Sequence, residues 1–444
     1  MNSSDSPKQK SSVRHTRAIA RDRSKHPNID PPDEEVERLL TELLHPLTFA
    51  QVAHFQKLGL RERVLTLPVM VAFVLSLLWR QIGSVREGVR TLHQEGLLWT
   101  GPLLVSAQAM QQRLRTLPSL LWERILSDLL PMMQQRFQQR QRPLPTAVAH
   151  ALKHFRAILA VDGSTLDALQ KQIGLLRETT GKPLAGRMAA LLDIASLLPR
   201  QVWYEENSAA HDQVFWQRTI VALEPNVLLL FDLGFVNYPF FDQLSTQNIG
   251  FITRLRSSAH VRVLKTLQEG PAVRDCLITL GQGDTRCETT LRMVALLYKG
   301  KWYRYLTNQI DPLVLPCVYV VALYWQRWRI EEAYLMVKRL LGLSYFLSGA
   351  INAVQTQLWA TWILYAVLTD LCDAVAEGIK QPFAMISMEM VYRGLYHFSQ
   401  AYQKAKADDP VQYLVVKARE LAVIKAKRPK ALDAVELLTN QLKA

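Results

Sequence analysis

The chain has 444 residues, with 53 Lys and Arg against 39 Asp and Glu, and its net charge of +14 gives a pI of about 9.6. This length allows about two to four domains, and the charge favours a polyanionic partner, nucleic acid before an anionic membrane surface. The four cysteines contain no CxxC pair, which argues against a disulfide framework or zinc site, and the polar N-terminus and short apolar runs predict neither a secretory signal nor a membrane span.

The first part of the chain predicts a basic tail followed by helices. Residues 1–30 are rich in Lys and Arg and poor in large apolar side chains, which predicts a disordered arm. In 31–138 apolar residues recur at helical spacing, and we expect a helical DNA-binding domain. The polar stretch 139–150 begins with QRQRPLPT and is predicted to be a linker.

Two short predicted helices joined by WTGPLL suggest a helix-turn-helix-like unit within the helical region. Ser106 is the expected N-cap of the second helix. Ordinary packing of a helical bundle explains the same pattern at least as well. If the unit binds DNA, the side chains available to bases and phosphates are Gln108, Gln112, Arg113 and Arg115.

Residues 151–256 predict a mixed α/β sheet, because apolar strands alternate there with helical segments. Asp162 in AVDGSTLD and Asp232 in LLLFDLGF each lie where an apolar run gives way to glycine. Open α/β sheets carry their chemistry at such strand ends, although a turn-forming role explains either aspartate alone. Three further acids compete for the second position: we expect Asp193 in the middle of a strand, Asp212 as a helix cap and Asp242 inside the next helix.

The remaining ranges predict an insertion and two helical segments. Residues 257–308 are β-rich and contain a basic hairpin, LLYKGKWYRY, which includes Trp302. Residues 309–345 form the expected core helix, and 346–444 a helical C-terminal region.

The segment YWQRWRIEEAYLMVK at 324–338 predicts one helix without Gly or Pro. On such a helix Tyr324, Arg327, Glu331 and Lys338 share a stripe about 60° wide, and we expect Tyr334, Leu335 and Met336 to point elsewhere. Trp325 and Trp328 are expected in the core. An exposed ladder of ion pairs fits the stripe, and so does a phosphodiester site, where the carboxylate holds a metal and the cations hold phosphates.

Three carboxylates on separate elements suit two divalent metal ions a few ångströms apart, as in metal-assisted phosphoryl transfer. Asp162, Asp232 and Glu331 are the candidates. Mg²⁺ prefers such oxygen ligands.

The order AVDGSTLD, LLLFDLGF, YLTN and YWQRWRIEEAYLMVK resembles the insertion-sequence-four family of DDE transposases. The family signature is Tyr, two residues, Arg, three residues, Glu, six residues and Lys, and this chain matches every position. The resemblance covers about 155–345. It implies an α/β mixed fold with a ribonuclease-H-like catalytic core, a β-rich insertion, and helical N-terminal and C-terminal regions.

By position, the resemblance implies that Asp162, Asp232 and Glu331 are catalytic and bind two Mg²⁺ ions, for which Mn²⁺ substitutes. Tyr324, Arg327 and Lys338 would bind DNA phosphates, and Trp302 is the candidate for capturing a flipped base.

The function implied is cut-and-paste transposition of a bacterial insertion sequence, in the cytoplasm at the nucleoid. The partners implied are double-stranded DNA, both terminal inverted repeats and target, and a second protomer in the synaptic complex, with no membrane. Two alternatives remain: a non-catalytic DNA-end-binding repressor from a decayed element, and a metal-dependent nuclease without strand transfer.

Overall fold

The computed structural model describes residues 34–60, 63–166, 186–283, 286–298, 300–343, 347–348, 350–426 and 434–443. The basic arm predicted for 1–30 lies outside these residues.

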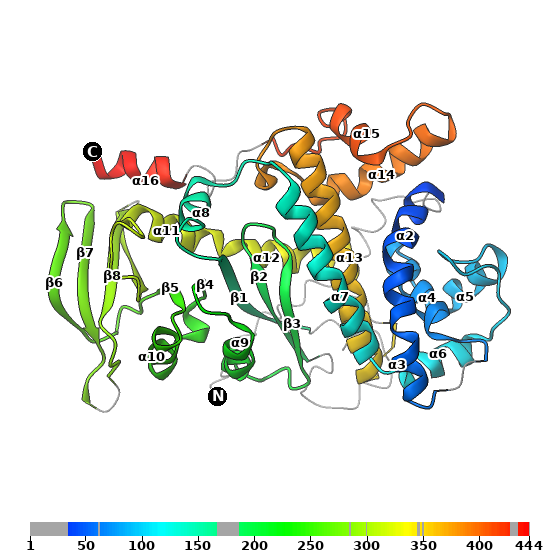
Figure 1. Cartoon of the computed structure of the whole chain (residues 1–444), viewed down its shortest axis with the longest axis horizontal. Coiled ribbons are helices and arrows are strands. Elements are labelled where there is room, and N and C mark those ends of the chain that lie inside the picture. Colours follow the sequence, from blue (N-terminus) through cyan, green and yellow to red (C-terminus); the bar gives the residue numbers. More distant parts are fainter. Residues whose placement is uncertain are drawn as a thin grey trace, which may run out of the picture.

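In the described part, a single mixed sheet runs from the middle of the molecule to one end (Figure 1). Its strand order is β3-β2-β1-β4-β5-β9-β8-β7-β6. The strands are β1 (Ala157–Thr165), β2 (Arg187–Asp193), β3 (Pro199–Glu205), β4 (Val227–Leu230), β5 (Gly250–Arg254), β6 (Val261–Glu269), β7 (Val273–Leu280), β8 (Leu291–Tyr298) and β9 (Lys301–Thr307). They include every strand predicted from the sequence.

The centre of the sheet is parallel and its flanks are antiparallel. β1 pairs in parallel with β4, and β4 with β5, whereas all other neighbours pair antiparallel. The carboxyl ends of β1, β4 and β5 therefore meet at one edge. The basic hairpin predicted around LLYKGKWYRY is confirmed, because β8 and β9 pair with Tyr298 opposite Lys301.

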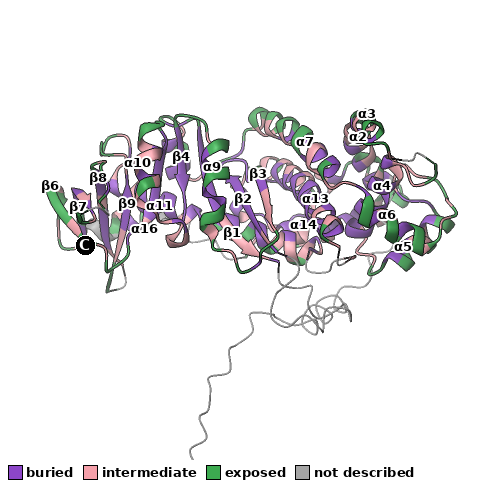
Figure 2. Ribbon diagram, turned by 90° about the horizontal axis from the view of Figure 1, so that it is seen from below, coloured by how far each residue is buried: buried purple, intermediate pink, exposed green. Residues whose placement is uncertain are grey.

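Helices cover both faces of the sheet (Figures 1 and 2). One face packs on α9 (Trp216–Ala222) and α10 (Tyr238–Thr246), and the other on α11 (Cys317–Gln326) and α12 (Trp328–Leu335). Side chains of β1 alternate between these cores: Ile158 and Ala160 join the α11–α12 side, while Leu159 and Val161 join the α9–α10 side. The same alternation directs Asp162 towards α12.

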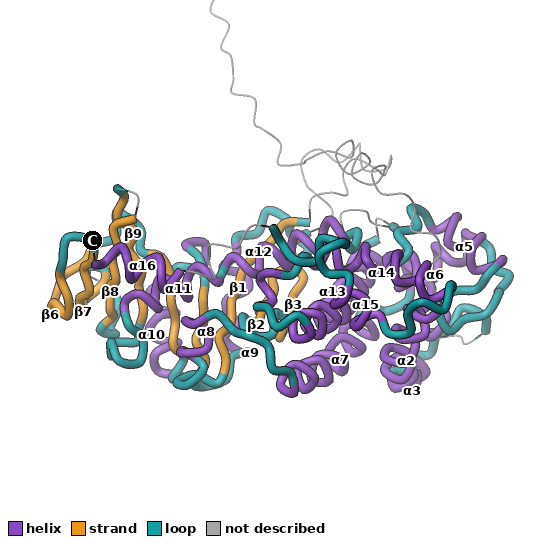
Figure 3. Tube along the Cα trace, turned by 90° about the horizontal axis from the view of Figure 1, so that it is seen from above, coloured by secondary structure: helices purple, strands orange, loops and turns teal. Residues whose placement is uncertain are grey.

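Most of the remaining helices form one body at the other end of the molecule (Figures 1 and 3). The central helix α13 lies beside α7, and their side chains share one core with those of α2, α4, α5 and α6. The predicted ranges 31–138 and 346–444 thus pack together. These helices are α2 (Glu34–Ala50), α3 (Val52–Lys57), α4 (Leu67–Trp79), α5 (Val85–Gln94), α6 (Ala107–Thr116), α7 (Leu120–Gln139), α13 (Ile351–Gly378), α14 (Met388–Gln403) and α15 (Pro410–Val416). Two further helices, α8 (Thr146–Ala151) and α16 (Ala434–Lys443), lie apart from this body and contact α11 beside the sheet (Figure 1).

α13 alone, among the helices that the structure describes, is long and apolar enough to cross a membrane by length and composition. However, 83% of its apolar window is buried inside the protein. Its apolar side chains pack against α7 and the neighbouring helices, as in the interior helix of a large core.

The prediction of one regular helix over 324–338 is wrong in detail. α11 ends at Gln326, α12 begins at Trp328, and the last turn, Met336–Leu340, is π-helical. Such π turns occur frequently at functional sites because they re-aim side chains. Trp328 was expected in the core but is 54% exposed, on the side of α12 that also carries the exposed Glu332 and Leu335. Its ring packs on the guanidinium of Arg327.

Candidate active site

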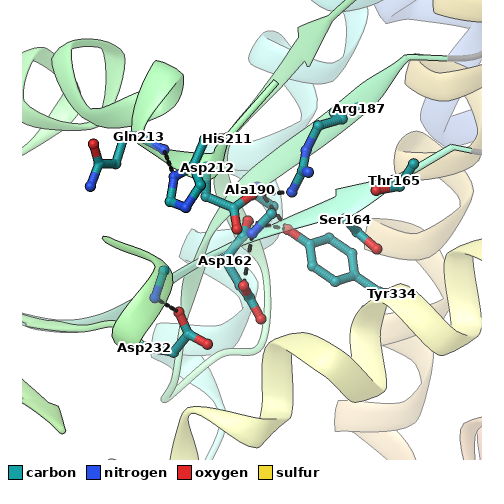
Figure 4. Close-up of polar contacts among 12 residues, drawn as sticks. Asp162, Ser164, Thr165, Arg187, Ala190, His211, Asp212, Gln213, Asp232 and Tyr334 are labelled. Atoms are coloured by element: carbon teal, nitrogen blue, oxygen red, sulfur yellow. Dashed lines mark hydrogen bonds and ion pairs between the residues drawn. The ribbon is translucent and has the colours of Figure 1, made fainter. Parts of the chain in front are cut away.

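Asp162 and Asp232 stand at the carboxyl edge of two neighbouring parallel strands (Figure 4). Asp162 lies in β1, and its Oδ1 accepts a hydrogen bond from the amide of Gly163 at 2.8 Å. Asp232 follows β4, and its Oδ1 accepts one from the amide of Gly234 at 2.7 Å. Each carboxylate is oriented by the backbone amide of a nearby glycine, which lies within β1 for Asp162 and in the turn after β4 for Asp232.

Arg327 joins the first aspartate to the glutamate of the signature. Its Nη1 lies 3.1 Å from Oδ2 of Asp162, and its Nη2 lies 2.9 Å from Oε1 of Glu331. The guanidinium is 5% exposed and the Asp162 side chain 15%, whereas Glu331 is 39% exposed. The predicted stripe therefore lies against the carboxyl-terminal part of β1, and Glu331 is the most exposed of the three side chains.

Burial and the neighbouring acids disfavour the ionised form of Asp162, and a nearby positive charge would stabilise it. Burial, together with the carboxylates of Asp232 and Glu331, raises the pKa of Asp162 to about 7, against the opposing effects of Arg327 and of the Gly163 amide. Asp232 also acts on Arg327 and Tyr324 through its charge. All three predicted acids thus share one electrostatic environment.

The two outer residues of the stripe also contact the cluster or its strand. Tyr324 is buried, its ring centroid lies 5.8 Å from Cζ of Arg327, and burial raises its pKa to about 12, so it stays a neutral phenol. Lys338 donates hydrogen bonds to Oγ of Ser164 at 2.7 Å and to the carbonyl of Thr165 at 2.8 Å. The signature residues therefore contact β1 from Asp162 to Thr165.

Tyr334 was predicted to point away from this stripe, and that prediction is wrong. The side chain lies three residues after Glu331, about 60° from it around a helix, and its hydroxyl donates to the carbonyl of Asp162 at 2.6 Å. Helical spacing alone would have found this residue.

A fourth carboxylate, that of Asp212, lies close to Gly163 and Gly234. Asp212 opens the 3₁₀ turn Asp212–Phe215, after the N-cap residue His211, and pairs with Arg187 of β2. A Cβ added to Gly163 would clash with its Oδ1, and one added to Gly234 would lie 3.2 Å from its Oδ2. Asp212 therefore packs between the backbone segments that carry Asp162 and Asp232.

The other two competing acids have structural partners. Asp193 ends β2, rather than lying mid-strand; it is buried, pairs with Arg200 at 2.8 Å and accepts the amides of Ala195 and Ser196. Asp242 lies in α10, as predicted. It accepts the Cys287 thiol and the amide of Thr289, which fixes the insertion loop to the core.

Trp302 lies near the start of β9, which runs antiparallel to β5. The start of β9 therefore projects from the same edge as the acids. The ring is 37% exposed, with Cζ of Arg274 5.0 Å from its centroid. A ring that is only partly covered leaves surface for a ligand.

The recognition candidates divide between the two sides of α6. Gln108, Gln112 and Arg115 are exposed and share one face. Arg113 turns inwards instead: its Nε donates to the carbonyl of Leu65 at 3.1 Å and its guanidinium lies over the ring of Phe55. Burial lowers the pKa of Arg113.

The carboxylates fit divalent metal ions by donor chemistry, since all are hard oxygen ligands. The unfavourable burial of Asp162 beside two acids is the feature that a cation would relieve. As the side chains stand, no three His, Cys, Asp or Glu groups in the described ranges are close enough to hold an ion. Arg327 instead neutralises Asp162 and Glu331.

Comparisons with known proteins agree with this geometry. Residues 153–367, which include all three acids and the signature, match the family model of the transposase DDE domain. Over 222 residues the chain is 29% identical to "Putative transposase y4zB" of Sinorhizobium fredii (strain NBRC 101917 / NGR234). That alignment covers 48% of this chain and 60% of the relative, so it spans less than two thirds of either protein. Together these similarities support a DDE transposase.

Proposed function

We propose that this chain is the transposase of a bacterial insertion sequence, which binds the terminal inverted repeats and performs metal-dependent cleavage and strand transfer. The observation that carries the proposal is the contact of Arg327 with both Asp162 and Glu331. It joins residues 165 positions apart, on a strand end and a helix, into one acidic cluster. No structural need of the sheet itself requires that cluster.

In this proposal Asp162, Asp232 and Glu331 are the metal ligands, with Mg²⁺ as the natural ion. The chemistry that two such cations supply when bound is activation of the attacking hydroxyl and neutralisation of charge on the leaving oxygen. Arg327 holds Asp162 and Glu331 in the cation-free protein. With the carboxylates engaged by cations, its planar, permanently charged group would be suited to bind a phosphate. Tyr324 and Lys338 are proposed as further phosphate ligands.

The sheet supports a ribonuclease-H-like core within this proposal. Three antiparallel strands are followed by two parallel ones, in the order β3-β2-β1-β4-β5, and the two aspartates lie on adjacent strands. Strands β6 to β9 extend the sheet after β5, which corresponds to the expected β-rich insertion.

Basic side chains beside the acids suggest the path of the DNA backbone. The cations Arg254, Arg256, Lys301 and Arg304 gather where β5 ends and β9 begins. Arg256 donates to the carbonyl of Leu233, next to Asp232. A phosphate backbone laid along this edge would pass the three carboxylates. We further propose that two protomers act together on paired DNA ends, at the bacterial nucleoid.

The test uses the inverted repeats that flank the coding sequence in its genome. A duplex carrying one repeat, labelled at either strand, is incubated with the protein, Mg²⁺ and a supercoiled plasmid. We expect a nick at the repeat boundary and then joining of the new 3′ end to the plasmid, both abolished by EDTA. Cleavage without joining would indicate a nuclease, and binding without cleavage a repressor; either result would overturn the proposal.

A further inference from the structure

The hydroxyl of Tyr334 links three elements at the position of Asp162 (Figure 4). It donates to the carbonyl of Asp162 in β1 at 2.6 Å and accepts the amide of Ala190 in β2 at 3.0 Å. Asp162 and Ala190 face each other in the β1–β2 register. The phenol thus bridges the two strands at the residue whose side chain is the proposed metal ligand.

The bridge also connects the helix that carries Glu331. Tyr334 lies on α12, less than one turn after Glu331. The Tyr334 side chain is 5% exposed, and its ring meets the ring of Trp362 of α13 edge-on at 6.1 Å. A tyrosine has few rotatable bonds, and its hydroxyl both donates and accepts. In a dry interior, such a bridge fixes the distance between α12 and β1.

A second property separates this link from the ion pairs of Arg327. Arg327 contacts the carboxylates themselves, so those contacts change whenever a cation or phosphate occupies the site. The Tyr334 hydroxyl bonds to the backbone of Asp162 and Ala190 and not to the carboxylates, and the phenol is neutral. Burial raises the pKa of Tyr334 well above the usual value of a phenol, so the side chain stays neutral. The Tyr334 bonds therefore persist through binding and reaction.

We propose that Tyr334 is a positioning residue, which sets the separation of Asp162 and Glu331 through their backbones. This inference rests on the proposed function, because it assumes that these two carboxylates act together. The hydroxyl makes both backbone hydrogen bonds. Tyr334→Phe removes it and keeps the ring, so this is the informative variant.

Tyr365→Phe is the matched control. Tyr365 is also buried, its ring also contacts Trp362, and its hydroxyl donates to the carbonyl of Leu197 at 3.0 Å. The control removes one buried hydroxyl bonded to a backbone carbonyl without touching Asp162 or Glu331.

Four quantities are measured on both variants and on Glu331→Gln. They are the melting temperature, the affinity for the inverted-repeat duplex, the single-turnover cleavage rate at saturating DNA and Mg²⁺, and the Mn²⁺ concentration that half-saturates binding to the DNA-free protein. For Tyr334→Phe we expect melting and DNA affinity close to those of Tyr365→Phe. We expect the cleavage rate to fall about 10- to 100-fold, and the half-saturating Mn²⁺ concentration to rise about 10-fold, the range of partners that orient ligands. Hydrogen exchange of the Ala190 amide should accelerate in Tyr334→Phe alone.

The outcomes separate this inference from the proposed function. If Glu331→Gln is inactive but Tyr334→Phe cleaves and binds Mn²⁺ like Tyr365→Phe, the positioning role is overturned and the proposed function stands. Unchanged exchange at Ala190 would equally overturn it, since the bridge would then not be present in solution. If Tyr334→Phe loses activity only in proportion to a lower melting temperature, the residue is structural and the inference fails. Wild-type cleavage by Glu331→Gln overturns the proposed function, and this inference with it.

Discussion

The Nη1 atom of Arg327 lies 3.1 Å from Oδ2 of Asp162, and the charge of this arginine opposes the rise in the pKa of that carboxyl. The same guanidinium therefore competes with any cation that Asp162 would bind. In Arg327→Gln we expect Mg²⁺ to bind the DNA-free protein more tightly, because the competing charge is gone. Cleavage should nevertheless fall, because the proposed phosphate ligand is also lost.

The measurement is the rise in melting temperature as Mg²⁺ is added, which reports binding to the folded state. Arg329→Gln is a useful control, since Arg329 is also buried and pairs with Glu332 instead. A weaker response to Mg²⁺ in Arg327→Gln than in wild type would contradict competition at this site.

A substitution of Gly163 tests how tightly the strand segment next to Asp162 is packed. A methyl group there would meet the carboxylate of Asp212, held by Arg187. We expect Gly163→Ala to lose about 1–3 kcal/mol of the free energy of unfolding, the usual cost of overpacking, and to lose cleavage as Asp162 shifts. Gly101→Ala, which meets no atom within 4 Å, should be nearly neutral in urea denaturation. Equal stability of the two variants would mean that Asp212 moves aside at little cost.

Variants of the two arginines of α6 should distinguish a role in DNA recognition from a role in folding. Arg115 is exposed, so Arg115→Ala should weaken binding to DNA, with a smaller salt dependence if it contacts a phosphate. Arg113 packs on Phe55 and the Leu65 carbonyl, so Arg113→Ala should mainly lower the melting temperature. Salt titrations of DNA affinity with the native duplex decide this. An Arg115→Ala protein with unchanged affinity and salt slope would remove α6 from the DNA interface.

Trp302 tests base capture during second-strand cleavage. If a base must leave the stack, an aromatic platform returns about 1–3 kcal/mol, and the exposed ring of Trp302 can offer it. Trp302→Ala should then nick the first strand at the wild-type rate but accumulate nicked DNA instead of hairpin or blunt product. A gel that resolves the three species gives the answer. A parallel loss of nicking and hairpin formation, or no loss of either, would exclude the role.

Much of the sheet could be predicted because its signals are local. The apolar runs before Asp162 and Asp232 are long enough for buried strands, and β4 ends just before Asp232, as predicted. The predicted strand end at Asp162 is wrong, because β1 continues through Gly163 to Thr165, paired with β2. The side of the sheet that each aspartate faces follows from the two-residue repeat of a strand.

Three features could not be predicted because they depend on tertiary packing. The ion pair of Arg327 with Asp162 crosses 165 positions, and neither helical spacing nor the family resemblance indicated it. The break before Trp328 follows no Gly or Pro, so a regular helical wheel placed that ring wrongly in the core. Helical spacing separates Arg113 from Arg115, but the partners of Arg113, the Phe55 ring and the Leu65 carbonyl, come from other segments of the chain.

The central claim is that Glu331 acts in cleavage rather than in binding DNA, and its neighbour supplies the control. Glu332 pairs with Arg329, and its side chain is 54% exposed. Single-turnover cleavage of the inverted-repeat duplex is measured with Glu331→Gln and Glu332→Gln, at concentrations that give equal DNA occupancy. We expect Glu332→Gln to cleave within about twofold of wild type and Glu331→Gln to lose orders of magnitude at unchanged affinity, because phosphate contacts carry the binding and the carboxylates the chemistry. Wild-type cleavage by Glu331→Gln would contradict the account.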